Sequence, residues 1–250
     1  MSFDASKLTF PDRVVVTDQV VDTSTLDPER RQAFIGLFQR VVERYQAAEV
    51  PRYVVGLVGP TGSGKSVIAS LFDQFASQLA LPFRFASVGI DAYHFTNEYL
   101  RAHTIDGAPM KAVKGRYDTY DVAKLARALA AFRAGRNVKF AVYSRAAHDP
   151  VEDIIDVSQD KVLLLLEGLW LLHDSPQWAQ IRPLIDHSIF IEARKDEARS
   201  GVIRRHVTGG RSVDDASNYY DTVDARNFDL VMKTRPRADE IIPSYYLAGP

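Results

Sequence analysis

The sequence predicts an α/β protein built on a doubly wound, mostly parallel β-sheet flanked by helices. Two observations carry this prediction. Short apolar runs typical of buried strands alternate with amphipathic helical segments, and a glycine-rich loop joins the first such run to the helix after it. The chain has 250 residues, of which 46% are hydrophobic and 25% charged, as in ordinary globular proteins. Because no repeat or linker interrupts the pattern, we expect a single domain over residues 1–250.

Residues 1–50 are expected to precede the sheet as an N-terminal extension and a helix. Residues 1–23 are weakly patterned and support no firm assignment. Thr25 or Asp27 can cap a helix that has Pro28 in its first turn, and apolar residues then recur on one face. We expect this helix to end at Pro51, directly before the first strand of the sheet.

The segment from Gly59 to Ser66 has the pattern G-x-x-x-x-G-K-S of a phosphate-binding loop. It follows an apolar strand at 53–58 and precedes a helix, so this context favours a nucleotide site over an ordinary glycine-rich turn. Lys65 would reach the β- and γ-phosphates of the nucleotide, and the Ser66 hydroxyl would bind Mg²⁺. The expected nucleotide-binding residues are Gly59, Pro60, Thr61, Gly62, Ser63, Gly64, Lys65, Ser66 and Val67.

The remaining pattern predicts five more strands and three more helical segments. Strands are expected at 83–90, 138–143, 162–166 and 187–191, with a last short one at 228–232. Residues 92–120 are irregular, polar and aromatic, and a loop of that length in a compact domain is usually functional. Asp121 caps a helix through Ala134. A basic helix spans 194–206, Gly209 and Gly210 interrupt it, and helix resumes over 213–226.

Carboxylates follow two of the predicted strands, where ligands of doubly wound sheets bind. Asp91 comes after the strand at 83–90 and could orient an acceptor hydroxyl and take its proton, or it could cap the next turn. Glu167 ends the apolar strand at 162–166, where a buried carboxylate needs a charged partner. That partner could be Mg²⁺, directly or through water. Glu167 could also contact the acceptor, cap a helix or form an ion pair.

The basic segment at about 194–226 is predicted to be a lid that closes over the nucleotide. Arginines there could neutralise the transferring phosphoryl group. The alternative is a solvated basic face paired with Asp196 and Glu197. On the third strand, Tyr143, Arg145 and His148 could line an acceptor pocket, although a lone histidine such as His148 is often structural.

The overall composition excludes several other classes of protein. The net charge of −1 offers no basis for binding nucleic acid or an anionic membrane. The absence of cysteine excludes disulfides, thiolate nucleophiles and cysteine zinc sites. The sequence has no apolar run long enough to span a bilayer and no signal peptide pattern, so a cytoplasmic enzyme is expected.

Together these segments resemble the phosphoribulokinase/uridine kinase family of small-molecule kinases, from about Tyr53 to Val231. Besides the phosphate-binding loop, the resemblance rests on 91–94, 114–121, 142–144, 165–169 and the arginine-rich segment. It implies ATP-dependent phosphorylation of a hydroxyl on a small polar metabolite, with Mg²⁺, and makes a homodimer reasonable. The implied catalytic residues are Asp91 as base, Lys65, Glu167, Arg204 and Arg205, with Arg211 at the nucleotide. The implied acceptor residues are Tyr93, His94, Arg116, Asp118, Tyr143, Arg145 and His148.

Departures from the family pattern bear on the acceptor. The segment at Gly115 lacks the His-Pro-Asp pattern of uridine kinases, and Arg145 replaces an aromatic residue that would stack on a pyrimidine. The loop also differs from that of typical pantothenate kinases. A sugar such as fructose is therefore the first expectation, with a nucleoside or pantothenate as alternatives. A GTPase is disfavoured, because the sequence has neither Asp-x-x-Gly after a strand nor Asn-Lys-x-Asp. In a non-catalytic nucleotide-binding module, Asp91 and Glu167 would have no role.

Overall fold

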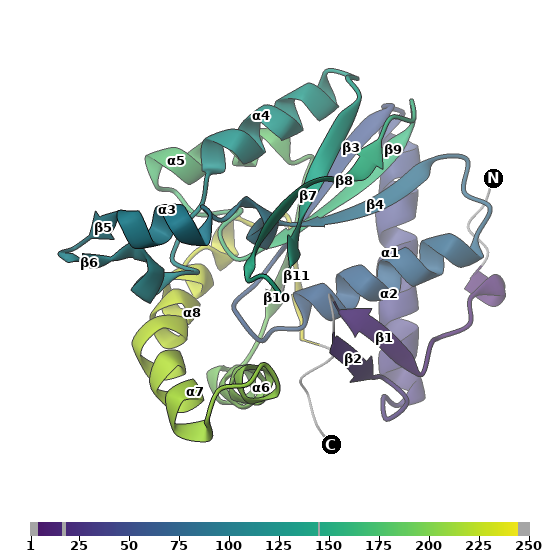
Figure 1. Ribbon diagram of the computed structural model, residues 1–250. Helices are drawn as coiled ribbons and strands as arrows, with labels where there is room; N and C mark the ends of the chain where they lie inside the picture. Colours follow the sequence, from purple (N-terminus) through teal and green to yellow (C-terminus); the bar gives the residue numbers. More distant parts are fainter. Residues whose placement is uncertain (1–4, 17–18, 145, 245–250) are drawn as a thin grey trace.

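Five parallel strands form the centre of the protein in the computed structural model, which describes residues 5–16, 19–144 and 146–244 (Figure 1). Their spatial order is β11-β10-β3-β9-β4, so the chain crosses over between neighbours as in other doubly wound sheets. The predicted fold class is confirmed. The strands are β3 (Arg52–Val58), β4 (Arg84–Gly89), β9 (Val162–Gly168), β10 (His187–Glu192) and β11 (Glu240–Pro243).

Strands β3 and β9 are the buried centre of the sheet, and both are almost entirely apolar. The side chains of Val54, Leu57, Leu164 and Leu165 are all 0% exposed. One core cluster packs between the sheet and helices α1 and α2, and the other lies on the face covered by α4. Since both faces of a parallel sheet are covered, its strands read as continuous apolar runs, which is why the sequence revealed them.

Helices α1 and α4 begin and end close to where the sequence predicts, whereas α3 and α5 were not predicted. Asp27 caps α1 by accepting a hydrogen bond from the Arg30 backbone at 2.8 Å, with Pro28 as first residue. The helix ends before Pro51, with Glu49 in the left-handed region at φ 53°. Asp121 caps α4. The helices are α1 (Pro28–Ala48), α2 (Lys65–Gln78), α3 (Asn97–Ala102), α4 (Val122–Arg133), α5 (Pro176–Ala179), α6 (Lys195–Thr208), α7 (Val213–Tyr219) and α8 (Ala225–Met232).

The strand expected at 138–143 exists, but it lies outside the parallel sheet. It is β7 (Val138–Ser144), which pairs antiparallel with β8 (Asp149–Val157) in a two-stranded ribbon. A connection of four residues allows only antiparallel pairing, whereas a parallel pair needs a long crossover. The sequence did not reveal β8, because most of its residues are exposed and it lacks an apolar run.

The strand expected at 228–232 is wrong, because these residues belong to helix α8. Phe228 and Val231 are buried together with Asn227, at the three- and four-residue spacing of a helix face. The fifth strand of the sheet is β11 instead, at 240–243. It lies at the sheet edge with only one strand neighbour, and its alternating exposure left no continuous apolar signal.

Small antiparallel hairpins and a basic helical segment complete the described residues. β1 (Arg13–Val16) and β2 (Gln19–Asp22) form a hairpin beside α2, and β5 (Thr104–Ile105) pairs with β6 (Ala108–Pro109). Helices α6, α7 and α8 follow β10, with a π-helical turn at Tyr220–Asp224 between the last two. Within the described residues, no helix is both long and apolar enough to cross a membrane.

The buried centre of the sheet makes a direct stability prediction. Leu164→Ala should lower the free energy of unfolding by about 2–5 kcal/mol, because Leu164 is completely buried and its truncation leaves a cavity. Ile154→Ala is the control: this side chain on β8 is 55% exposed, and the change should stay within about 0.5 kcal/mol. Urea unfolding of both variants measures the difference. Equal losses would contradict the assigned burial.

Candidate active site

The phosphate-binding loop connects β3 to α2 at the carboxyl edge of the sheet, as the sequence predicts. Gly62 and Gly64 adopt φ values of 83° and 91°, a region that side chains rarely enter. Ser63 donates its backbone N–H to the Pro60 carbonyl at 3.1 Å, which closes the turn. Helix α2 then begins at Lys65, so its free N–H groups and positive dipole face the loop. The Val67 side chain is buried in the core, which leaves only its backbone for a nucleotide.

Lys65 lies buried in the loop, with its charged end near two carboxylates. Its Nζ donates to the Pro60 carbonyl at 2.9 Å, and the residue is 7% exposed. Burial lowers the pKa of Lys65 to about 8, while the charges of Glu167 and Asp91 act in the opposite direction. An ammonium group held this way can donate a further hydrogen bond to an anion such as a nucleotide phosphate.

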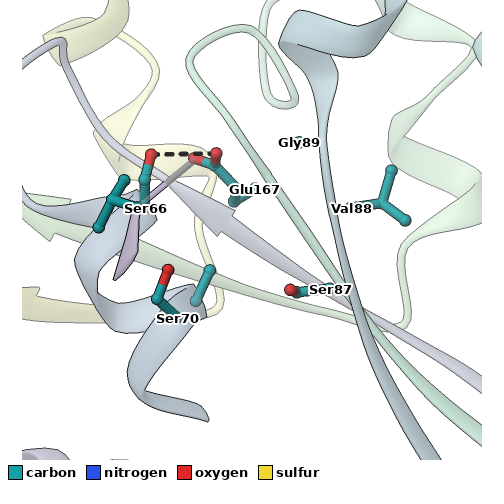
Figure 2. A pocket seen from close by; sticks show the side chains of 8 residues that line it. Ser66, Ser70, Ser87, Val88, Gly89 and Glu167 are labelled. Carbon is teal, nitrogen blue, oxygen red and sulfur yellow. Dashed lines mark hydrogen bonds between the residues drawn. The ribbon is translucent and has the colours of Figure 1, made fainter. Parts of the chain in front are cut away.

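Glu167 stands at the end of β9, between the ends of β3 and β4. It is in register with Leu57 on one side and Gly89 on the other. Figure 2 shows its carboxylate beside Ser66, whose hydroxyl donates to Oε1 at 3.1 Å. A Cβ on Gly89 would lie 3.0 Å from that same oxygen. A glycine at this position therefore leaves room for the Glu167 carboxylate.

A pocket of about 110 Å³ opens beside this pair. Figure 2 shows Ser70 from α2 and Ser87 from β4 on its lining, in addition to Ser66 and Glu167, and Val16 of the N-terminal hairpin also reaches it. Carboxylate and hydroxyl oxygens are the ligands that Mg²⁺ prefers. The residues present therefore fit the predicted metal, with Ser66 and Glu167 as its candidate ligands.

Asp91 lies in a 3-10 turn, Ile90–Tyr93, directly after β4. The hydrogen bond of that turn runs from the His94 backbone N–H to the Asp91 carbonyl, so the carboxylate is not what closes it. The carboxylate is 48% exposed and accepts a hydrogen bond from the Tyr120 hydroxyl at 3.3 Å. It can therefore meet an acceptor while Tyr120 holds its orientation.

His94 is buried next to Asp91. Its Nδ1 lies 2.9 Å from the Asp91 carbonyl, and its ring stacks on Tyr120 with centroids 3.8 Å apart. Burial lowers the pKa of His94 to about 4, so the ring is neutral near pH 7. Tyr93, by contrast, is 2% exposed and packs in the hydrophobic core, where burial raises its pKa. The structure does not bring Tyr93 to the acceptor side.

The other predicted acceptor residues lie in different surroundings. Arg116 and Asp118 pair with each other at 2.7 Å, and Arg116 also bonds Asp106, so their charges are already matched. Tyr143 lies near His94, with ring centroids 5.9 Å apart. The His148 side chain is exposed in the turn before β8, and Arg145 lies outside the described residues.

Several polar residues around Asp91 were missed by the sequence analysis. Lys111 and Lys114 both donate to the Asn97 side chain, and Tyr219 donates its hydroxyl to the Lys114 carbonyl at 2.8 Å. Tyr120 lies in the segment 114–121 that carries the family resemblance, but it was not among the residues named for the acceptor. Lys114 lies in the segment 114–121 that carries the family resemblance, whereas Lys111 and Asn97 were marked only by their place in the irregular stretch 92–120.

The predicted lid arginines have different positions. Arg205 is half-buried on α6 and close enough to Lys65 to lower its pKa. Arg211 lies over the Tyr219 ring at 3.9 Å. Arg204 is exposed. Arg194 pairs with Asp196 at 2.7 Å and lies 3.8 Å from Glu197, so the alternative of a paired surface face is confirmed for that arginine.

Helix α6 packs directly on the phosphate-binding loop. A Cβ placed on Gly62 would lie 2.7 Å from the Ala198 carbonyl oxygen and 2.9 Å from Val202. Ala198 and Val202 are buried, whereas the outer face of α6 carries charge. The loop and the basic segment are therefore one packed unit, and Gly62 is required by this contact as well as by its φ.

Comparisons with known proteins place this site in context. The Phosphoribulokinase / Uridine kinase family matches residues 54–246. The "Uncharacterized protein YggC" of Escherichia coli K12 is 32% identical over 191 residues, which are 76% of this chain and 77% of that protein. A pantothenate kinase of Histophilus somni is 23% identical over 231 residues, 82% of this chain and 71% of that protein.

A solved structure supports the same fold. The "putative fructose transport system kinase" from Silicibacter sp. TM1040 superposes with a TM-score of 0.73 at 24% identity. The match covers 84% of this chain and 98% of that one. The central parallel sheet with its flanking helices is therefore a fold that this chain shares with that protein.

The contact between the loop and α6 makes a prediction about two glycines. Gly62→Ala should destabilise the protein by more than the ~1–2 kcal/mol that a side chain costs in the left-handed region, because its Cβ also collides with α6. Gly210→Ala is the matched control, since Gly210 has φ 96° but open space around its Cβ position. Urea unfolding compares the two variants. Equal destabilisation would show that α6 does not rest on the loop.

Proposed function

The chain belongs to the phosphoribulokinase/uridine kinase family of ATP-dependent small-molecule kinases, and from that premise we propose that it phosphorylates a hydroxyl of a small polar metabolite. The observation that carries this proposal is that the loop and Asp91 lie at the same edge of the sheet. Ser66 of the loop bonds Glu167 at 3.1 Å, Glu167 is in register with Gly89, and the half-exposed Asp91 follows Gly89 by two residues. A donor cation and a candidate base thus share one site.

On the donor side, the loop N–H groups and Lys65 bind the ATP phosphates. Ser66 and Glu167 would hold Mg²⁺, which neutralises phosphate charge when bound. The hydrogen bond from Ser66 to Glu167 supports this role, because both oxygens already point to one place.

On the acceptor side, Asp91 orients the hydroxyl and takes its proton as the oxygen attacks the γ-phosphorus. The bond from that phosphorus to the bridging oxygen of ADP breaks, and ADP leaves. Tyr120 keeps the carboxylate in position through its hydrogen bond. Arg205, which lies near Lys65, is the lid arginine best placed to neutralise the transferring group, and residues 194–226 would act as the lid.

A sugar such as fructose is the first acceptor to test, with a nucleoside or pantothenate as alternatives. The similar solved structure bears a fructose-related name, and the pantothenate kinase relative supports the third choice. A screen of ATP consumption over sugars, nucleosides and pantothenate tests the activity. We further propose a single cytoplasmic domain that works on small molecules and forms a homodimer.

The base assignment makes a kinetic prediction. Asp91→Asn should lower kcat by about 10²–10⁴-fold with ATP affinity unchanged, because asparagine still accepts the Tyr120 hydrogen bond but cannot take a proton. Steady-state kinetics and calorimetric ATP titration measure the two quantities. Asp156→Asn, on the exposed side of β8, is the control and should behave as wild type. Normal turnover of the Asp91 variant would overturn the assignment.

The metal assignment makes a second prediction. Glu167→Gln should raise the Mg²⁺ concentration needed for half-maximal rate by about tenfold or more, with the acceptor KM unchanged, because the amide loses the negative charge. Mg²⁺ titrations at saturating ATP measure this. Ser70→Ala, in the same pocket one turn along α2, should leave the Mg²⁺ requirement unchanged. A changed acceptor KM with an unchanged Mg²⁺ requirement would assign Glu167 to the acceptor instead.

A further inference from the structure

Two ammonium groups converge on one amide oxygen of helix α3. Lys111 and Lys114 both donate to Oδ1 of Asn97, the second at 3.0 Å. Lys114 also donates to the His148 carbonyl at 2.7 Å, and its side chain is only 11% exposed. Placing two positive charges on a single neutral oxygen is unfavourable unless a negative charge joins them.

Asp149 supplies one negative charge near the two lysines, which does not balance two positive charges. Asp149 lies 4.0 Å from Lys114, and its Oδ1 already accepts the Asn97 backbone N–H at 2.7 Å. The positive charges of Arg101 and Arg211 lower the pKa of Lys111. The pKa of Lys114 falls to about 8, first through burial and then through the charge of Lys111. The cluster of Arg101, Lys111, Lys114 and Arg211 therefore carries excess positive charge.

This cluster borders the proposed acceptor site. Lys114 Nζ lies 5.1 Å above the Tyr143 ring, which in turn neighbours His94, and Asp91 is close enough to act on Lys114. The basic helical segment reaches the same place, because Tyr219 donates its hydroxyl to the Lys114 carbonyl and carries Arg211 over its ring.

His94 supplies an independent sign of a missing ligand. The residue is 8% exposed, and its Nε2 is buried without a hydrogen-bond partner among the described residues. Nδ1 faces the Asp91 carbonyl and must donate to it, so Nε2 of the neutral ring is an acceptor. A buried acceptor left unpaired is costly, and a ligand hydroxyl would satisfy it.

Resting on the kinase function proposed above, we propose that the acceptor is an anionic polyol, that is, a phosphate monoester or carboxylate that carries several hydroxyls. Its anionic group binds Lys111 and Lys114, with Arg101 and Arg211 at the rim. One hydroxyl donates to His94 Nε2, and another faces Asp91 and receives the phosphoryl group. A free neutral sugar would fill only the His94 and Asp91 ends of this site.

The test compares acceptors that differ in a single anionic group, namely a hexose with its phosphate monoester and glycerol with glycerate. The anionic member should have a kcat/KM at least about tenfold higher, as expected for a charge-assisted hydrogen bond. The two pairs distinguish phosphate from carboxylate. Equal rates for neutral and anionic members would overturn the inference and leave the kinase function intact.

Variants assign the discrimination to residues. Lys111→Ala should raise the KM of anionic acceptors by about 10–100-fold and leave neutral acceptors and kcat unchanged. Lys139→Ala removes an exposed lysine of β7 and should change nothing. His94→Phe keeps the ring stack on Tyr120 and should raise the KM of all acceptors alike. If Lys111→Ala affects neutral and anionic acceptors equally, the cluster is not an anion site.

A binding readout separates this inference from the kinase function itself. With the loop saturated by a non-hydrolysable ATP analogue, inorganic phosphate should bind the wild-type protein in calorimetry, and Lys111→Ala should weaken that binding at least about tenfold. The result holds or fails even if no acceptor in the panel is phosphorylated. Phosphate binding that is absent, or unchanged in Lys111→Ala, would overturn the anionic acceptor site.

Discussion

The structure depends on the interaction of charged side chains at the carboxyl edge of the sheet, where its apolar central strands end. Strand β9 runs through four fully buried leucines before it reaches Glu167, and Lys65 is buried across from it. A buried ammonium is costly unless carboxylates and hydrogen bonds surround it. Glu167, Asp91 and the Pro60 carbonyl together supply that environment. The same requirement brings the ends of β3, β9 and β4 into a single site.

The basic segment is tied to both ends of that site. Ala198 and Val202 of α6 lie against Gly62 of the loop, while Tyr219 of α7 bonds the Lys114 carbonyl beside the cation cluster. Movement of this segment would therefore act on the nucleotide and the acceptor together. Such coupling suits a phosphoryl transfer, which depends mainly on positioning and on neutralising charge.

The parts of the fold that the sequence predicted are those whose structure is encoded by a few consecutive residues. The continuous apolar run of β9, the cap at Asp27 and the loop from Gly59 to Ser66 each display their whole signal within a few residues. Strands β8 and β11 were not predicted, because their pairing with neighbouring strands, and not their own composition, makes them strands. The segment 228–232 was wrongly predicted as a strand, because a short apolar run fits a strand and a buried helix face equally well.

The sequence alone therefore determined the phosphate-binding loop, its strand and helix, and the two carboxylates at the strand ends, which are the proposed donor side and the proposed base. Chain direction places those residues together, because parallel strands bring their carboxyl ends to one edge. Tertiary structure decided what surrounds Asp91 on the proposed acceptor side. It paired Arg116 with Asp118, buried Tyr93 in the core, and gathered Asn97, Lys111 and Lys114 from an irregular segment. No periodicity encodes those contacts, because they join loop residues whose path depends on what they pack against.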